Sequence, residues 1–221
     1  MTTRTALITG STGGIGKSLV SSLQENVNVI SPTRKELDLS SNSSIDDYIS
    51  SLDVPIDIIV NCAGIHKAGN CEDLTTHDFQ NILQINLIAP FQLISGLVNG
   101  MKKRKYGRIL NISSIWSIVS KEKRSIYSAS KSGLDGLTRT LALELAPFNI
   151  LVNSIAPGYV NTNMIQQYNS KKELEKIKEM IPLNRFAEPD EIAELVKFLS
   201  SEKNSYITGQ IIPIDGGYVL R

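Results

Sequence analysis

A glycine-rich loop near the start of the chain narrows the possible folds more than any other segment. It reads Thr9-Gly10-Ser11-Thr12-Gly13-Gly14-Ile15-Gly16, follows the apolar run Ala6–Ile8 and opens a helical pattern. Glycine allows the backbone to turn tightly and to approach a bulky anion closely. The free N–H groups and the positive dipole end of a following helix favour the same anion. A strand, glycine loop and helix in this order predict a dinucleotide pyrophosphate site, and a turn without a ligand is the plainer interpretation.

The rest of the chain alternates short apolar runs with longer helical patterns, which predicts βαβ units. Runs such as Ile58–Val60 are apolar without alternation, as in strands covered on both faces. We therefore expect an α/β fold with a doubly wound parallel sheet of about seven strands and helices on both faces. The predicted strands are Arg4–Thr9, Val27–Ile30, Glu36–Leu39, Ile56–Asn61, Arg108–Ser113, Ile150–Ala156 and Gln210–Ile214. The predicted helices are Lys17–Gln24, Ser43–Leu52, Asp78–Lys103, Tyr127–Leu145 and Pro189–Leu199, with Gln166–Lys178 as a helix or surface flap.

Length and composition exclude several classes of protein. The 221 residues fit one domain, residues 1–221, because domains commonly hold about 100–200 residues. A formal charge of +1 gives no field that favours nucleic acid or a membrane, and no apolar run approaches the ~20 residues of a membrane span. The start of the chain does not resemble a signal peptide. Two cysteines and two histidines are too few for a disulfide framework or a His-rich metal site, so we expect a cytoplasmic protein without metal.

Several motifs together resemble the short-chain dehydrogenase/reductase family. Thr9–Gly16 is similar to its Thr-Gly-x-x-x-Gly-Ile-Gly loop, and Asn61-Cys62-Ala63-Gly64 to its Asn-Asn-Ala-Gly motif, with Cys62 in place of the second Asn. The other matching segments are Asp38-Leu39, Asn86, Ser113-Ser114, Tyr127-Ser128-Ala129-Ser130-Lys131 and Pro157-Gly158-Tyr159-Val160-Asn161-Thr162. The resemblance implies a Rossmann-like fold and hydride transfer between a nicotinamide and a carbonyl or secondary alcohol. Arg185–Ala193 and Tyr206–Gly217 resemble 3-oxoacyl-thioester (acyl-carrier-protein) reductase-like members, and many sugar, polyol and ketone reductases share these segments.

Tyr127 is the candidate proton donor for the alkoxide that forms when a carbonyl is reduced. The pKa of free tyrosine, near ~10, is too high for easy proton exchange at neutral pH. Lys131 lies four residues later on the same helix face, and its charge, with that of oxidised nicotinamide, is expected to lower the pKa of Tyr127. The resemblance implies that Ser114 hydrogen-bonds the substrate oxygen and that Asn86 helps to hold a water that carries protons from Lys131 to solvent.

The resemblance also implies the contacts of the cofactor. They are Gly10, Ser11, Thr12, Gly14, Ile15 and Gly16 at the pyrophosphate, Asp38 and Leu39 at adenine, Asn61, Ala63 and Gly64 beside the adenosine ribose, Tyr127 and Lys131 at the nicotinamide ribose, and Pro157, Gly158, Val160 and Thr162 towards the carboxamide.

The end of the second predicted strand favours NADP(H), although NAD(H) stays open. NAD enzymes of this kind usually carry an acidic residue there, where Thr33 stands in this chain. The neighbouring Arg34 would pair with the 2′-phosphate of NADP, and an ordinary surface arginine is the alternative. Only Ser31–Lys35 separate the second and third predicted strands, where the family usually has a helix. We expect the missing helix to leave the adenine side of the cofactor site more open.

Three segments are expected to line the substrate side: Ser114–Ser120, Tyr159–Gln167 and Asn184–Phe186. Ser114, Trp116 and Tyr159 are the predicted substrate contacts, and Trp116 is either a pocket wall or plain packing.

Two basic runs have both a functional and a plainer interpretation. Lys121–Arg124 could attract anionic substrates at the pocket mouth or could be a solvated loop. Lys102–Lys105 could dock an acidic acyl carrier protein or simply complement a helix dipole. The apolar helices Asp78–Lys103 and Tyr127–Leu145 predict a homotetramer or homodimer.

Three functions compete at this point. The first is an NADP-dependent carbonyl reductase, with a 3-oxoacyl thioester as the candidate substrate. The second is a sugar, polyol or nucleotide-sugar dehydrogenase with the same site. The third is a non-catalytic nicotinamide-sensing protein, which would typically lack Tyr127 or Lys131.

Overall fold

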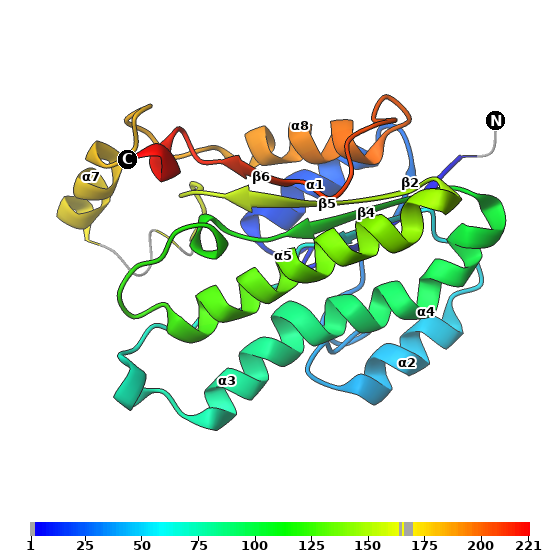
Figure 1. Cartoon of the computed structure of the whole chain (residues 1–221), viewed down its shortest axis with the longest axis horizontal. Helices are drawn as coiled ribbons and strands as arrows, with labels where there is room; N and C mark the ends of the chain where they lie inside the picture. The colour runs from blue at the N-terminus through cyan, green and yellow to red at the C-terminus, as the bar shows by residue number, and fades with distance from the viewer. Residues whose placement is uncertain (1–2, 164, 166–169) are drawn as a thin grey trace.

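Six parallel strands form one sheet in the computed structural model, which describes residues 3–163, 165 and 170–221 (Figure 1). The strand order is β2-β1-β3-β4-β5-β6, so the chain winds outward in both directions from the β1–β3 pair. All five pairings are parallel. The strands are β1 (Thr5–Thr9), β2 (Asn28–Ile30), β3 (Ile58–Asn61), β4 (Gly107–Ile112), β5 (Ile150–Pro157) and β6 (Ile211–Ile214). The α/β fold with a parallel sheet is confirmed.

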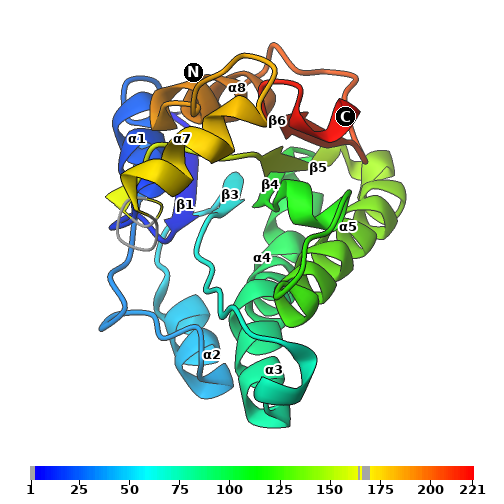
Figure 2. The ribbon, with the colours of Figure 1, turned by 90° about the vertical axis from the view of Figure 1, so that its left-hand side faces the viewer.

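Helices cover both faces of the sheet, which Figure 2 shows nearly end-on. Successive strand residues point to opposite faces: Leu7 packs into the core under α2, α4 and α5, whereas Ala6 and Ile8 pack into the core under α1 and α8. This double burial explains why the strands are apolar without alternation. The helices are α1 (Gly14–Leu23), α2 (Asn42–Ser51), α3 (Thr76–Leu83), α4 (Ala89–Arg104), α5 (Ser125–Leu145), α7 (Lys171–Glu179) and α8 (Pro189–Ser200).

The prediction of a third strand over Glu36–Leu39 is wrong. The backbone N–H groups of Glu36 and Leu37 donate to the carbonyl of Thr33 at 3.1 and 3.0 Å, which closes a turn instead of a ladder. Leu37 and Leu39 pack into the hydrophobic core on the face that α2 and α4 cover. Leu37 and Leu39 are therefore apolar because they cover this core. Without the predicted strand, β2 is the edge of a six-stranded sheet.

The predicted helix Asp78–Lys103 is interrupted by one wide turn. Residues Gln84–Ile88 form a π-helical turn between α3 and α4. The helix Thr76–Arg104 is long and apolar enough to cross a membrane by length and composition alone. In this fold α4 buries Leu93, Ile94 and Met101 in the core.

The polar stretch predicted over Gln166–Lys178 contains α7 from Lys171 onward. Its first part, Gln166–Asn169, lies outside the described residues, as do Gln166 and Gln167 of the predicted substrate segment.

Candidate active site

The predicted site residues meet at the carboxyl ends of the strands. β1 ends at the glycine loop, β3 at Asn61, β4 two residues before Ser114, and β5 at Pro157. Parallel strands place their carboxyl ends on one edge of the sheet, where open α/β folds bind their ligands. The arrangement therefore brings the motifs together although they are far apart in the sequence.

The geometry of the glycine loop fits a pyrophosphate. Gly10 has a φ of +73°, and a Cβ there would lie 2.7 Å from the Ala63 backbone. A Cβ on Gly16 would collide with the carbonyl oxygen of Gly10. Among the described residues no side chain caps the N-terminus of α1, so its first N–H groups remain available to an anion. Ser11 Oγ donates weakly to the Ser31 carbonyl at 3.5 Å, which ties the loop to the end of β2.

The segment after β5 reaches back to the glycine loop. A Cβ on Gly14 would lie 2.6 Å from Thr162 Cγ2, so Thr162 lies directly over the loop. Gly158 fits closely against Asp215, where a Cβ would be 2.8 Å from the Asp215 Cα. Val160 is buried and forms a parallel bridge with Ala187. These contacts fix the Pro157–Thr162 motif above the predicted cofactor site.

Tyr127 and Ser114 lie together, as predicted. Tyr127 is the third residue of α5 and lies in its first turn, and Ser114 follows β4 with only 7% of its surface exposed. Burial raises the pKa of Tyr127, and a hydrogen bond with Ser114 and the charge of Arg124 oppose this rise. The direction is opposite to the expected lowering, because in the protein alone desolvation outweighs the nearby charges.

Lys131 is a buried ammonium group beside Tyr127. It is 3% exposed, and its Nζ donates to the Ile112 carbonyl at 2.7 Å. The Nζ lies 5.8 Å from the centre of the Tyr127 ring. Burial lowers the pKa of Lys131 to about 8, against the opposing influence of Cys62 and Asp135. Lys131 can therefore both carry and release a proton near neutral pH.

Asn86 lies in the π-helical turn and is fully buried. Its Oδ1 accepts from the Ile65 N–H and its Nδ2 donates to the Ile65 carbonyl, both at 2.9 Å. A Cβ on Gly64 would lie 3.4 Å from both Asn86 Oδ1 and Lys131 Nζ, so the two polar groups converge there. Single π-helical turns inside α-helices are frequent at functional sites.

The Asn61 side chain is engaged within the protein, and its predicted place beside the adenosine ribose stays a prediction. Its Nδ2 donates to Asn111 Oδ1 at 2.8 Å, and Asn111 Nδ2 donates to Thr138 at 2.9 Å. The side chain is thus part of a buried polar network under the site. Ala63, whose N–H donates to Thr9 Oγ1 at 3.2 Å, and Gly64 keep their backbone next to the glycine loop.

The predicted adenine side is built from one exposed loop. Arg34 is 82% exposed at its side chain and lies 3.9 Å from Asp38. The Glu36 carboxylate accepts from both the N–H and the hydroxyl of Thr33 at 2.8 Å. A carboxylate therefore lies beside the expected 2′ position, which sequence reasoning missed because Glu36 was assigned to a strand.

Aromatic side chains cluster on the predicted substrate side. Trp116 lies edge-on to Tyr159 at 6.1 Å and to Tyr218 at 5.9 Å, and Tyr159 lies 5.5 Å from Tyr218. The contacts place Trp116 and Tyr159 in one aromatic cluster, and the role of Trp116 as a pocket wall stays a prediction. Sequence reasoning missed Tyr218, since nothing in its local pattern shows that the end of the chain folds back to this site.

His66 was also missed, and it pairs with Arg124 of the predicted basic run Lys121–Arg124. The His66 ring stands edge-on to the Tyr127 ring at 5.1 Å, and Arg124 Nη1 donates to His66 Nε2. Burial, helped by the charge of Arg124, lowers the pKa of His66 to about 4. His66 is therefore a neutral acceptor at neutral pH.

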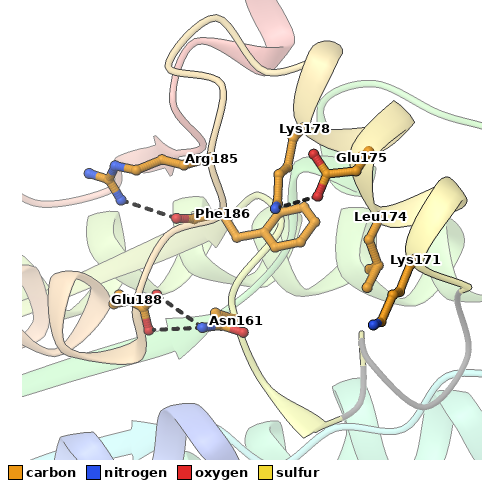
Figure 3. Close-up of a pocket in the computed structure, with 8 residues that line it drawn as sticks. All are labelled: Asn161, Lys171, Leu174, Glu175, Lys178, Arg185, Phe186 and Glu188. Atoms are coloured by element: carbon orange, nitrogen blue, oxygen red, sulfur yellow. Dashed lines mark hydrogen bonds and ion pairs between the residues drawn. The ribbon is translucent and has the colours of Figure 1, made fainter.

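A cavity of about 580 Å³ lies between α7 and the segments around Asn161 and Arg185–Glu188 (Figure 3). Phe186, from the predicted substrate-side segment Asn184–Phe186, contributes to its wall. Ser114, Tyr127 and Trp116 do not line it. Among the described residues no group of three or more His, Cys, Asp or Glu side chains is arranged to hold a metal ion.

The basic run Lys102–Lys105 is far from this site. It ends α4 and precedes β4, so it lies at the amino-terminal edge of the sheet. Arg104 is paired with Asp57 at 3.1 Å, and Lys102 lies 5.0 Å from the centre of the Phe148 ring. Docking of an acyl carrier protein on this run stays a prediction.

Comparisons with known proteins agree with the geometry. A model of the family described as enoyl-(acyl carrier protein) reductase matches residues 10–219. The chain is 37% identical to an uncharacterized oxidoreductase, YmfI of Bacillus subtilis, with 97% of this chain and 98% of the relative covered. It is 38% identical to the 3-oxoacyl-[acyl-carrier-protein] reductase FabG of Aquifex aeolicus, with 96% and 86% covered. The alignment with YmfI spans 239 positions against 221 residues here, so the relative carries residues that this chain lacks.

Two solved structures share the fold over nearly the whole chain. One is provisionally described as a gluconate dehydrogenase of Agrobacterium tumefaciens, with a TM-score of 0.90, 30% identity, and 98% of this chain and 96% of that chain covered. The other is provisionally described as an NAD(P)-dependent gluconate 5-dehydrogenase of Beutenbergia cavernae with bound NADP. Its TM-score is 0.91 at 28% identity, with 99% and 97% covered.

Proposed function

The chain belongs to the short-chain dehydrogenase/reductase family and is an NAD(P)-dependent oxidoreductase of CH–OH and C=O groups, and we propose that it uses NADP(H), with Tyr127 as the acid–base residue. The observation that carries the proposal is the convergence of four buried or half-buried polar side chains at one edge of the sheet. These side chains are Asn86, Ser114, Tyr127 and Lys131.

A bound nicotinamide supplies or accepts the hydride at the reacting carbon. The Ser114 hydroxyl orients the substrate oxygen, and the Tyr127 hydroxyl donates its proton to that oxygen during reduction. The Tyr127 O–H bond breaks as the O–H bond of the alcohol forms. Because burial raises the pKa of Tyr127, its neutral form is held ready to donate at neutral pH.

Lys131 returns a proton to Tyr127 after each reduction. Its lowered pKa of about 8 matches this task, because a group titrating near the working pH exchanges protons readily. Asn86 positions the segment at Gly64 and Ile65, beside Lys131 Nζ. We infer that a water between them connects Lys131 to solvent.

The preference for NADP(H) rests on Arg34. Its exposed guanidinium has a 3.9 Å contact with Asp38 as its one ion pair among the described residues, so it can turn to a 2′-phosphate. The related Beutenbergia protein was solved with bound NADP, which supports the same choice. The Glu36 carboxylate at Thr33 opposes it, since it would repel a phosphate and could bind a ribose 2′-hydroxyl.

The relatives support two substrate classes. The FabG name supports a 3-oxoacyl thioester on an acyl carrier protein. The two gluconate dehydrogenase structures support a sugar or polyol, and Arg124 beside Tyr127 favours an acidic member of this class. A non-catalytic sensor is disfavoured, because Tyr127 and Lys131 are both present and close together.

We also propose a homotetramer or homodimer that assembles through α4 and α5. Phe91 on α4 is 50% exposed, and Leu143 on α5 is 79% exposed. Large apolar side chains on two neighbouring helices are typical of an interface between copies of a chain.

The test is NADPH oxidation with a short 3-oxoacyl thioester and, separately, with 5-oxogluconate, each beside an NADH control. We expect turnover with at least one substrate and faster turnover with NADPH than with NADH. Absence of turnover on both substrates, with NADPH shown to bind, would contradict both substrate classes.

A further inference from the structure

Arg124 is a cation on the substrate side of the site without an acidic partner. None of the ion pairs among the described residues includes it. Its Nη1 donates to neutral His66, and its Nε is buried with no hydrogen-bond partner in the described part of the chain. An unpaired, half-buried guanidinium costs stability, and a ligand carboxylate would offset that cost.

The position of Arg124 is fixed from two sides. Its backbone precedes α5 as the N-cap residue, three positions before Tyr127. The neighbouring Lys123 carbonyl accepts from the Gly69 N–H at 3.3 Å, which joins the loop of Arg124 to the loop of His66. The backbone at Arg124 is therefore joined to the loop of His66, whose ring accepts a hydrogen bond from the guanidinium.

The charge of Arg124 acts on two tyrosine side chains. It opposes the rise in the pKa of Tyr127 and also that of Tyr159. Tyr159 belongs to the aromatic wall with Trp116 and Tyr218. The predicted substrate side thus combines the hydroxyl groups of Ser114 and Tyr127, the Arg124 cation and an aromatic cluster.

We propose that Arg124 binds the carboxylate of the substrate, so that the carbonyl compound reduced here is an oxo acid. Its carboxylate pairs with the guanidinium, while its carbonyl oxygen lies at Ser114 and Tyr127. The aromatic wall covers the chain between the two groups. The proposal rests on the proposed function and names its substrate class, and it favours a free acid over a thioester, which has no charge near its reacting carbonyl.

Binding tests the proposal without turnover. NADPH-loaded enzyme is titrated calorimetrically with lactate, 3-hydroxybutanoate and gluconate, and with the neutral amide of each. We expect at least one acid to bind about 10-fold or more tighter than its amide, because a charged hydrogen bond contributes roughly 1.5–3 kcal/mol. Equal binding of acid and amide throughout the series would overturn the proposal.

Variants assign the binding to Arg124. Arg124→Gln should abolish the difference between acid and amide, and Arg124→Lys should keep part of it. Lys121→Gln removes an exposed charge from the same loop and should leave the difference unchanged. A difference that survives in Arg124→Gln, or that Lys121→Gln abolishes equally, would refute the role of Arg124.

Kinetics give a second readout. With NADPH, Arg124→Gln should raise the KM for 3-oxobutanoate about 10- to 100-fold and change the KM for its ethyl ester less than about 2-fold. Equal effects on acid and ester would contradict the proposal. Acid binding that depends on Arg124, without turnover of any substrate, would place the failure in the proposed reaction and leave the carboxylate site standing.

Discussion

At the residue scale, the burial of Lys131 suits its proposed role in proton transfer but lowers the stability of the folded protein. Its ammonium group is 3% exposed, with the Ile112 carbonyl as its hydrogen-bond acceptor at 2.7 Å. Burial disfavours the charged form and lowers the pKa to about 8 from an ordinary 10.5. The unfolded chain therefore binds more protons between these pH values, and stability should rise with pH across that window.

We expect Lys131→Met to raise the free energy of unfolding by about 2 kcal/mol at pH 7, while abolishing turnover. The lowered pKa corresponds to roughly 3 kcal/mol, and the lost hydrogen bond offsets about 1 kcal/mol. Urea unfolding at pH 7 and at pH 10.5 measures this, and the advantage of the variant should shrink at the higher pH. A variant less stable than the wild type at pH 7 would show that Lys131 is stabilised by more than its burial costs.

The sequence predicts the proposed catalytic residues better than the side chains around them. Tyr127 and Lys131 are four positions apart on one helix, so their proximity follows from helical geometry alone. His66 and Tyr218 reach the same pocket from a loop and from the end of the chain. No local pattern reports such tertiary contacts, and both residues were missed.

At the element scale, the glycine loop needs its first glycine for its backbone shape. Gly10→Ala should destabilise the protein by at least about 2 kcal/mol and weaken NADPH binding, because φ is +73° and the Cβ would lie 2.7 Å from the Ala63 backbone. Gly13→Ala is the matched control, since its Cβ would meet only the Gly10 carbonyl at 3.5 Å. Thermal unfolding compares the two, and equal losses would argue against a conformational role of Gly10.

The loop that replaces the predicted third strand should set cofactor preference. Arg34→Ala should raise the KM for NADPH roughly 10-fold and leave that for NADH nearly unchanged, because only NADPH carries the 2′-phosphate. Glu36→Gln should lower the KM for NADPH by removing a repelling charge. Steady-state kinetics with both cofactors measure these changes. An equal effect of Arg34→Ala on the KM for NADPH and for NADH would show that Arg34 is an ordinary surface arginine.

The error over Glu36–Leu39 has a physical origin. Leu37 and Leu39 alternate with polar residues as in a half-buried strand, but they pack into the core that α2 and α4 cover. An alternation of apolar and polar residues indicates that one side of a segment is buried. It does not indicate which element buries that side. The buried strands β1, β3, β4 and β5 were predicted well, because a run covered on both faces has few alternatives.

At the scale of the whole molecule, the exposed apolar residues of α4 and α5 predict assembly. Light scattering should give two or four times the 24.3 kDa chain mass. Leu143→Asp should shift the protein towards the monomer, because a charge at a packed apolar contact costs several kcal/mol. An exposed polar residue on the same helix, Glu144, gives the control variant Glu144→Gln. A monomeric wild type would exclude this interface.

The central claim is that Tyr127 donates the proton to the substrate oxygen. The most direct test compares turnover and NADPH affinity in the wild type and in Tyr127→Phe, which removes one hydroxyl oxygen. We predict a loss of turnover of about 10²- to 10⁴-fold with an NADPH dissociation constant changed less than about 3-fold. Turnover that survives in Tyr127→Phe would contradict the claim and leave the four converging side chains without a proton donor.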